Sequence, residues 1–277
     1  MSDILSFFDF CDERMKIFHN RYTLGMQPPW TEDPIMSRYF FTNTYRELDK
    51  VSLWFIVKVL REEGSGLAID LLFSTILLRR CFNRPETYDL ILRACEDGGE
   101  NRYMTLSPQE FLHNKSRILR ALTKSKDSLY SHAYTLVVRS QRKNMAKSKA
   151  MVNLLYTIAN KWDSYLTPVV KAKSPAECLK EVRRIPFLNG GFYSYEVFCD
   201  LNYCEYFLDR WGVDAEQYVV NVGPGAVKGL AYETGYIKDP DGTPNQVLLR
   251  NLWKNQLDDF SHLFIKTKKR LNKIILT

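Results

Sequence analysis

Residues 174–201 read SPAECLKEVRRIPFLNGGFYSYEVFCDL, and this stretch indicates the fold most directly. It opens with Ser174, a proline and then Glu177, which is the pattern of a capped helix start. A turn rich in small and apolar residues follows over 185–191, and helical spacing of apolar residues resumes near Phe192. The stretch therefore predicts two helices joined by a short turn, in a helix-hairpin-helix outline.

Helical signals continue through the rest of the chain. The same start pattern recurs at Ser107-Pro-Gln-Glu110 and Thr243-Pro-Asn-Gln246, whereas alternating segments with hairpin turns are almost absent. We therefore predict an all-α fold. The expected helices span residues 4–20, 38–62, 67–82, 85–95, 108–122, 127–138, 146–165, 175–184, 192–207, 214–218, 225–235 and 244–257.

The length of 277 residues allows one large core or two intimate ones. We expect a single helical domain over residues 1–277, or two lobes with a cleft for DNA and substrate between them. No apolar segment is long enough to span a bilayer, and the six cysteines lack CxxC spacing, so a cytoplasmic protein with buried thiols is expected. The four histidines are scattered, so we expect no metal or other cofactor.

The charge of the chain favours a polyanionic partner. The net charge is +7 and the pI is near 9.0, which points to nucleic acid first. Ten Lys and Arg residues lie within 113–150 against one acid, and a second basic run lies within 266–273. We expect Arg139, Arg142 and Lys143 to contact DNA. A solvated surface that only keeps the protein soluble is the alternative for both runs.

A second informative stretch, residues 38–58, reads RYFFTNTYRELDKVSLWFIVK. Wound as a helix, it gathers four polar side chains near one face: Asn43, Arg46, Asp49 and Lys50. Apolar side chains occupy another face, which suggests a polar site at the edge of a core. The alternative is an ordinary surface helix with an Arg46–Asp49 pair one turn apart.

Two glycine-containing turns precede helices, where backbone N–H groups are placed to hold an anion. In the first, the candidate contacts to a DNA phosphate are Asn189, Gly190 and Gly191; an ordinary helical hairpin with a glycine cap is the alternative. The second is Asn221-Val-Gly-Pro-Gly225, with Lys228 one turn into the next helix. No GxxxxGK[ST] motif is present, so neither turn is a P-loop.

Two carboxylates, Glu196 and Asp200, lie four residues apart and share one face of the helix that follows the first turn. The surrounding residues are apolar and aromatic. Paired carboxylates in such surroundings suit acid–base chemistry. Alternatively, they serve as a cap partner and as a partner for a buried arginine.

Four separated segments together resemble the α-glutamyl/putrescinyl thymine pyrophosphorylase family. Residues 41–52, FTNTYRELDKVS, are similar to its signature FTNxYRxxDRxS, and residues 78–83, LRRCFN, contain its RxFN. Residues 189–201 resemble GxFxAYxxxxDL, and residues 221–230 resemble NxGPGAxRGL. The resemblance covers about residues 30–235. The chain departs from the family pattern at Lys50, Ser194, Lys228 and Ala231.

Members of this family are regarded as amino acid:DNA transferases of phage thymidine hypermodification. They are similar to a helical domain associated with 5-hydroxymethyluracil DNA kinases, and their fold is like that of helix-hairpin-helix DNA glycosylases. The resemblance implies transfer of an amino acid or polyamine onto the 5-methylene of pyrophosphorylated 5-hydroxymethyluracil in double-stranded DNA, with loss of pyrophosphate. A phage-encoded protein would act in the host cytoplasm. Two alternatives stay open: a non-catalytic DNA-binding module that works with a separate DNA kinase, and a glycosylase for modified bases.

The resemblance also implies roles for single residues. The pyrophosphate would be held by Arg46, Gly223, Gly225 and Lys228. Asp49 or Asp200 would be the base that deprotonates the amine or the anchor that holds it, and Asn43 and Asn221 would hold the uracil edge or position the chain. The expected substrate site is completed by Tyr45, Lys50 and Glu196. Asn221 stands where glycosylases typically carry a catalytic aspartate, which disfavours base excision.

Overall fold

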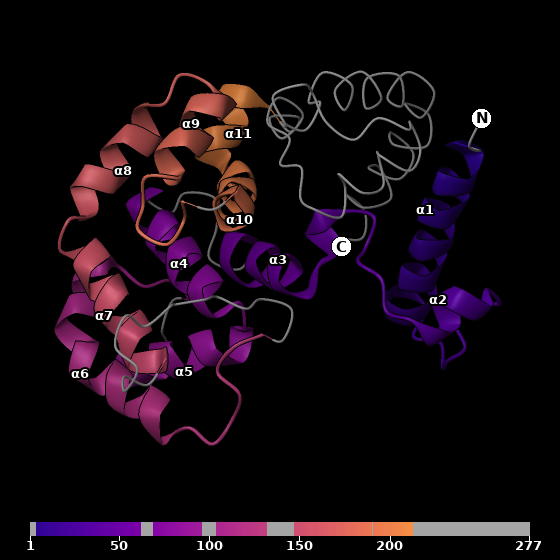
Figure 1. Ribbon diagram of the computed structural model, residues 1–277, viewed down its shortest axis with the longest axis horizontal. Coiled ribbons are helices and arrows are strands. Elements are labelled where there is room, and N and C mark those ends of the chain that lie inside the picture. The colour runs from indigo at the N-terminus through magenta and orange to yellow at the C-terminus, as the bar shows by residue number, and fades with distance from the viewer. Residues whose placement is uncertain (1–3, 62–68, 96–103, 132–146, 190, 213–277) are drawn as a thin grey trace, which may run out of the picture. The chain divides into compact units, whose positions relative to one another are not determined.

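The structure is a computed structural model of the chain, and it describes residues 4–61, 69–95, 104–131, 147–189 and 191–212 (Figure 1). The α-helices of this part are α1 (Ile4–Phe18), α2 (Pro34–Arg38), α3 (Lys50–Phe55), α4 (Ile69–Phe82), α5 (Pro85–Cys95), α6 (Pro108–Lys124), α7 (Lys147–Ala159), α8 (Trp162–Lys171), α9 (Pro175–Val182), α10 (Gly191–Asn202) and α11 (Glu205–Trp211). Three short turns of other helix types are η1 (His19–Thr23), η2 (Arg46–Leu48) and η3 (Ile56–Arg61). Within these residues there is no strand, so the all-α prediction is confirmed for the part that the structure describes.

The helix-start signals act as predicted where the structure describes them. The Ser107 side chain accepts a hydrogen bond from the Glu110 backbone N–H, and Glu110 accepts one from the Ser107 N–H, which is a complete capping box. Ser174 accepts from the Glu177 N–H in the same way at the start of α9. The third signal, at Thr243, lies outside the described residues.

The expected helix over 38–62 is wrong in its first half. Residues 39–45 are not helical, and the α-helix begins only at Lys50. Residues 41–43, which the sequence placed in this helix, are held instead by Arg14 of α1. The Arg14 guanidinium donates to the Thr42 and Phe41 carbonyl oxygens (3.1 and 2.9 Å) and to Asn43 Oδ1 (3.2 Å). A buried guanidinium needs such acceptors, and residues 41–43, which are not helical, supply them.

Other expected boundaries need smaller corrections. The expected helix over 127–138 is wrong for residues 127–131, which are irregular, and the rest of it is not described. The expected helices over 146–165 and 192–207 are each divided into two, with breaks at residues 160–161 and 203–204. The helices expected at 214–218, 225–235 and 244–257 lie outside the described residues.

The chain divides into two compact units: residues 1–53 with 222–277, and residues 54–221. In the second unit, α4 is the central helix, because every described side chain from Phe73 to Phe82 is buried. It contributes to one apolar cluster with α7–α11 and to another with α5–α7. Figure 1 shows α6, α7, α8 and α9 following one another around the outside of this unit, with α4 and α10 inside the arc.

All six cysteines are described, and each is a free thiol; five of them are buried, as expected. Burial raises the pKa of the Cys178 thiol from 9.0 to about 12, which keeps it neutral and unreactive at physiological pH. Among the helices that the structure describes, none has the length and apolar character needed to cross a membrane.

Candidate functional site

A polar cluster lies inside the second unit, where α4 packs against α10. Arg80 of α4 forms a bidentate pair with Asp200 of α10: Nε donates to Oδ2 at 2.5 Å and Nη2 to Oδ1 at 2.7 Å. Its Nη1 lies 2.9 Å from Oε2 of Glu196, one turn earlier on α10. The three side chains are only 2%, 0% and 1% exposed, respectively. This arrangement agrees with the alternative in which a buried arginine is the partner, and it extends that pairing to both carboxylates.

The end of α4 belongs to the same cluster. Arg80 Nη1 also lies 3.3 Å from Oδ1 of Asn83, a buried residue with a φ of 48°. An asparagine tolerates this left-handed conformation better than most residues, and here it turns the chain from α4 into α5. Residues 78–83 (LRRCFN) and residues 192–201 (FYSYEVFCDL) therefore meet in one buried network. Its role is to hold α4 against α10, since an unpaired buried charge would be costly.

Arg80 is the residue that sequence reasoning missed, although its segment was singled out. One signal was available: two arginines in succession, Arg79 and Arg80, interrupt an otherwise apolar helix that ends at Phe82. A cation inside such a run requires acidic partners. Glu196 and Asp200, equally isolated within an apolar run, were the natural candidates.

The predicted helical hairpin is present. The turn after α9 is closed by backbone hydrogen bonds from the Ile185 N–H to the Val182 carbonyl (3.1 Å) and from the Leu188 N–H to the Ile185 carbonyl (3.0 Å). The Ile185 and Leu188 side chains are fully buried and anchor the turn in the core. Of the expected phosphate contacts, Asn189 and Gly191 lie exposed at this turn, and Gly190 is not described.

Polar residues expected from the stretch 38–58 lie in the first unit. Asn43 is committed to the local structure: it accepts from Arg14, and its Nδ2 donates to the Leu48 carbonyl at 2.8 Å. Tyr45 packs against the small core formed by Phe18 and Leu48. These contacts of Asn43 and Tyr45 fix the position of the backbone directly before Arg46.

The other polar residues of that stretch, Arg46, Asp49 and Lys50, come next in the chain. Arg46 begins η2, and its carbonyl accepts from the Asp49 N–H at 3.0 Å. The Asp49 carbonyl in turn accepts from the Leu53 N–H at 2.8 Å, so Asp49 lies directly before α3. Arg46 and Asp49 are partly exposed, and Lys50 is exposed. They do not line one face of a continuous helix, because residues 39–45 are extended or irregular.

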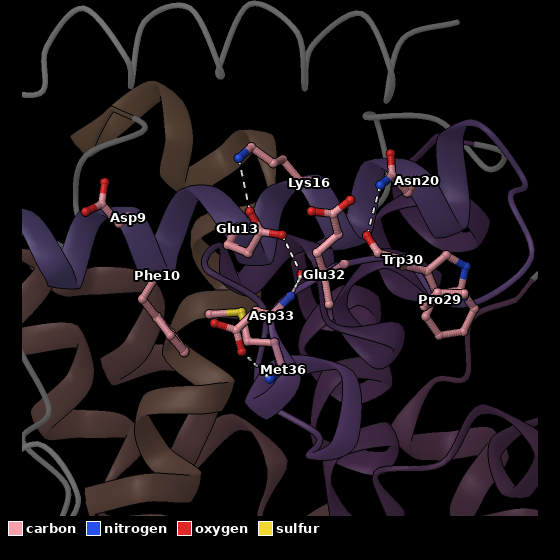
Figure 2. Close-up of a pocket in the computed structure, with 11 residues that line it drawn as sticks. Asp9, Phe10, Glu13, Lys16, Asn20, Pro29, Trp30, Glu32, Asp33 and Met36 are labelled. Carbon is pink, nitrogen blue, oxygen red and sulfur yellow. Dashed lines mark hydrogen bonds and ion pairs between the residues drawn. The ribbon is translucent and has the colours of Figure 1, made fainter.

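A pocket of about 860 Å³ lies in the first unit between α1 and residues 29–36 (Figure 2). Its carboxylates come from Asp9, Glu13, Glu32 and Asp33. The lining also includes Lys16 and the apolar side chains of Phe10, Trp30 and Met36. Glu13 accepts from the Thr31 hydroxyl at 2.5 Å and from Lys16 Nζ at 3.0 Å, and these bonds lower its pKa. No residue expected from the sequence lines this pocket. The acidic and aromatic character of the N-terminal residues was the available signal.

Several expected site residues cannot be placed. The following lie outside the described residues: Arg139, Arg142, Lys143, Gly190, Asn221, Gly223, Gly225 and Lys228. The others fall into two groups, with Asn43, Tyr45, Arg46, Asp49 and Lys50 in the first unit and Asn189, Gly191, Glu196 and Asp200 in the second. Among the described residues, no group of three His, Cys, Asp or Glu side chains is suited to hold a metal ion.

Comparison with known proteins gives one family. The family described as "5-hmdU DNA kinase, helical domain" matches residues 2–276. A 5-hmdU DNA kinase of Bacillus phage SP10 is 31% identical over 234 residues, which cover 79% of this chain and 34% of the phage protein. The chain therefore spans about a third of the length of that relative. No solved structure matches the chain.

Proposed function

Because the chain belongs to the family of 5-hmdU DNA kinase helical domains, we propose that it binds DNA carrying 5-hydroxymethyluracil and serves the modification of thymidine in that DNA. The match over residues 2–276 is the observation that carries the proposal. The net charge of +7 supports a DNA partner. The sequence contains no GxxxxGK[ST] motif, so we assign phosphoryl transfer to a kinase outside these residues.

The hairpin between α9 and α10 is the proposed contact to a DNA phosphate, in the manner of helix-hairpin-helix DNA glycosylases. The start of a helix presents unpaired backbone N–H groups, which attract an anion. Asn189 and Gly191 are exposed there, and Arg183 and Arg184 at the end of α9 are exposed as well. The proposal extends to Gly190 between them and to Arg139, Arg142 and Lys143 in the central basic run.

Transfer of an amine onto the modified base is the second candidate. It is favoured by the pocket between α1 and residues 29–36, whose carboxylates and aromatic rings suit an ammonium group. The pyrophosphate would be held by Arg46, Gly223, Gly225 and Lys228, and the base by Asn221, with Tyr45 and Lys50 nearby. Asn43 would position the chain through its bonds to Arg14 and Leu48. The co-substrate would be an amino acid or a polyamine.

Within this second candidate, Asp49 is a better base than Asp200. Both carboxylate oxygens of Asp200 accept hydrogen bonds from Arg80, and the residue is fully buried. An incoming ammonium would have to displace that arginine. Asp49 is partly exposed and lies beside Arg46 and Lys50. We therefore assign Asp200 and Glu196 to positioning α10 rather than to proton transfer.

One experiment separates the candidates. The purified chain is mixed with duplexes containing thymine, 5-hydroxymethyluracil or its pyrophosphorylated form, and binding is measured. The same duplexes are then incubated with the chain and with glycine, serine, glutamate and putrescine, digested to nucleosides and analysed by mass spectrometry.

The outcomes are distinct. Tighter binding to the modified duplexes with unchanged nucleosides supports the binding module. An amino-substituted nucleoside supports the transferase, and in that case Asp49→Asn should abolish the product while leaving DNA affinity unchanged. Free base or abasic sites would show a glycosylase. Equal binding to all three duplexes, with no product, would refute the proposed function.

A further inference from the structure

The outer face of α6 carries a stripe of basic side chains. His113, Arg117, Arg120 and Lys124 recur at helical spacing and are exposed. The opposite face carries Phe111, Ile118 and Leu122, all buried in the core of the second unit. Because the apolar face of α6 packs into the core, the basic side chains on the opposite face point toward solvent.

The start of α7 brings more cations to the end of α6. Lys115 Nζ lies 3.7 Å from the centroid of the Tyr156 ring, near the end of α7. Lys147, the first residue of α7, lies with its Nζ 4.1 Å from the ring centroid of Tyr130, six residues after α6 ends. The two helices are therefore antiparallel neighbours. Lys147 and Lys149 share this end of the helix pair with Lys124 and Lys126.

The irregular segment after α6 is fixed in place. The Ser131 N–H donates to the Phe82 carbonyl at 3.3 Å, Thr87 Oγ1 donates to the Leu129 carbonyl at 2.9 Å, and Arg84 donates to the Ser128 carbonyl. The Tyr130 ring also stacks on Phe82, with 5.3 Å between centroids. The surface is therefore preorganised, and little conformational entropy would be lost when it binds a rigid partner.

The charge of this surface is one-sided. Residues 108–131 and 147–149 contain seven Lys or Arg residues and two acids, Asp127 and Glu110, and Glu110 is engaged in the capping box at the far end of α6. Lys147 and Lys149 lie in the first turn of α7, where the helix dipole is positive and no acid is present. Cations there are unfavourable in the absence of an anion, because the helix dipole repels them. A bound anion would remove that cost.

We propose that this surface, formed by α6, residues 125–131 and the first turn of α7, binds the phosphate backbone of duplex DNA. The inference rests on the proposed function, which makes DNA the polyanion. Cations on two neighbouring elements are suited to a line of phosphates rather than to a single small anion. Its contacts fix the register of the duplex and are indifferent to the base sequence.

A pair of matched charge-reversal variants tests the proposal. The first changes Lys124, Lys126 and Lys149 to Glu; the control changes Lys161, Lys171 and Lys173 to Glu. All six lysines are exposed in the second unit, and both variants change the net charge equally. Affinity for an unmodified 20-base-pair duplex is measured against salt concentration. If the first variant melts early, Lys→Gln changes replace the Lys→Glu changes at all six positions, so that the two variants still change the net charge equally.

The first variant should bind at least tenfold more weakly than the control, and its slope of log K against log salt should be shallower by about 2–3, since each lost phosphate contact removes about 0.9. Equal losses in both variants would overturn the proposal, because net charge alone would explain them. The proposed function fails separately: a wild-type chain that binds thymine and 5-hydroxymethyluracil duplexes equally would refute that function and leave this surface intact.

Discussion

Arg80 joins α4 to α10 through a buried cluster of charges. Its guanidinium is buried and donates to three carboxylate oxygens on α10, two of them on Asp200 and one on Glu196. Removing one partner from such a cluster leaves a buried charge without compensation, which is far more costly than removing the whole cluster. The network therefore specifies how α4 meets α10.

Arg80→Met should lower the free energy of unfolding by about 3–5 kcal/mol, since it strands both carboxylates. Asp200→Asn should cost more than Glu196→Gln, because Arg80 pairs with both carboxylate oxygens of Asp200 and with one of Glu196. Urea unfolding followed by circular dichroism measures each value. Arg93→Met on α5, an exposed position, is the control and should change stability by less than about 0.5 kcal/mol. Arg80→Met with an effect as small as this control would show that the cluster is not stabilising.

The segment between α2 and α3 depends on α1 rather than on its own helical tendency. Arg14 holds the carbonyl groups of residues 41 and 42 together with the Asn43 side chain, and Asn43 in turn holds the Leu48 carbonyl. The T-shaped contact of the Phe10 and Phe41 rings, 5.4 Å between centroids, adds to the same anchor. The extended course of residues 39–45 is thus imposed by tertiary contacts.

Arg14→Met should release this segment without unfolding α1. The loss of hydrogen bonds from a charged donor should destabilise the segment by about 2 kcal/mol. Hydrogen–deuterium exchange should then become faster for the amides of residues 41–49, whereas those of α6 and α10 keep their protection. Lys16→Met, two residues further along α1 and exposed, is the matched control. Unchanged exchange in residues 41–49 would contradict the anchoring role of Arg14.

These elements also show what the sequence could predict. Start signals such as Ser107 with Glu110 are local, since the cap, the proline and the acid act within one turn, and the structure confirms them. The course of residues 39–45 could not be predicted, because it depends on Arg14, about 28 residues earlier in the chain. The partnership of Arg80 with Asp200 spans 120 positions. Spacing identified the two carboxylates as unusual, but only the packing of α4 on α10 shows what they hold.

The charge of the molecule as a whole should govern how tightly it binds any DNA. With a net charge of +7, the chain is attracted to phosphate groups whatever bases they carry. Recognition of a modified base should therefore appear as a difference in binding free energy between modified and unmodified DNA, added to the attraction that all DNA shares. Phosphate contacts release counterions and depend on salt, whereas contacts to a neutral hydroxymethyl group do not. The two contributions can be measured separately.

We expect affinities for a 5-hydroxymethyluracil duplex and for the matching thymine duplex to fall along parallel lines when log K is plotted against log salt. Both lines should be steep, because the same phosphates are contacted, and the offset between them should stay constant, because it comes from the base. Fluorescence anisotropy over about 50–300 mM salt covers the range in which such slopes are resolved. Coincident lines would mean that the hydroxymethyl group is not recognised. Lines of unequal slope would mean that the modification changes the number of phosphates contacted, and base recognition would then have to be sought in the geometry of the duplex rather than in a direct contact.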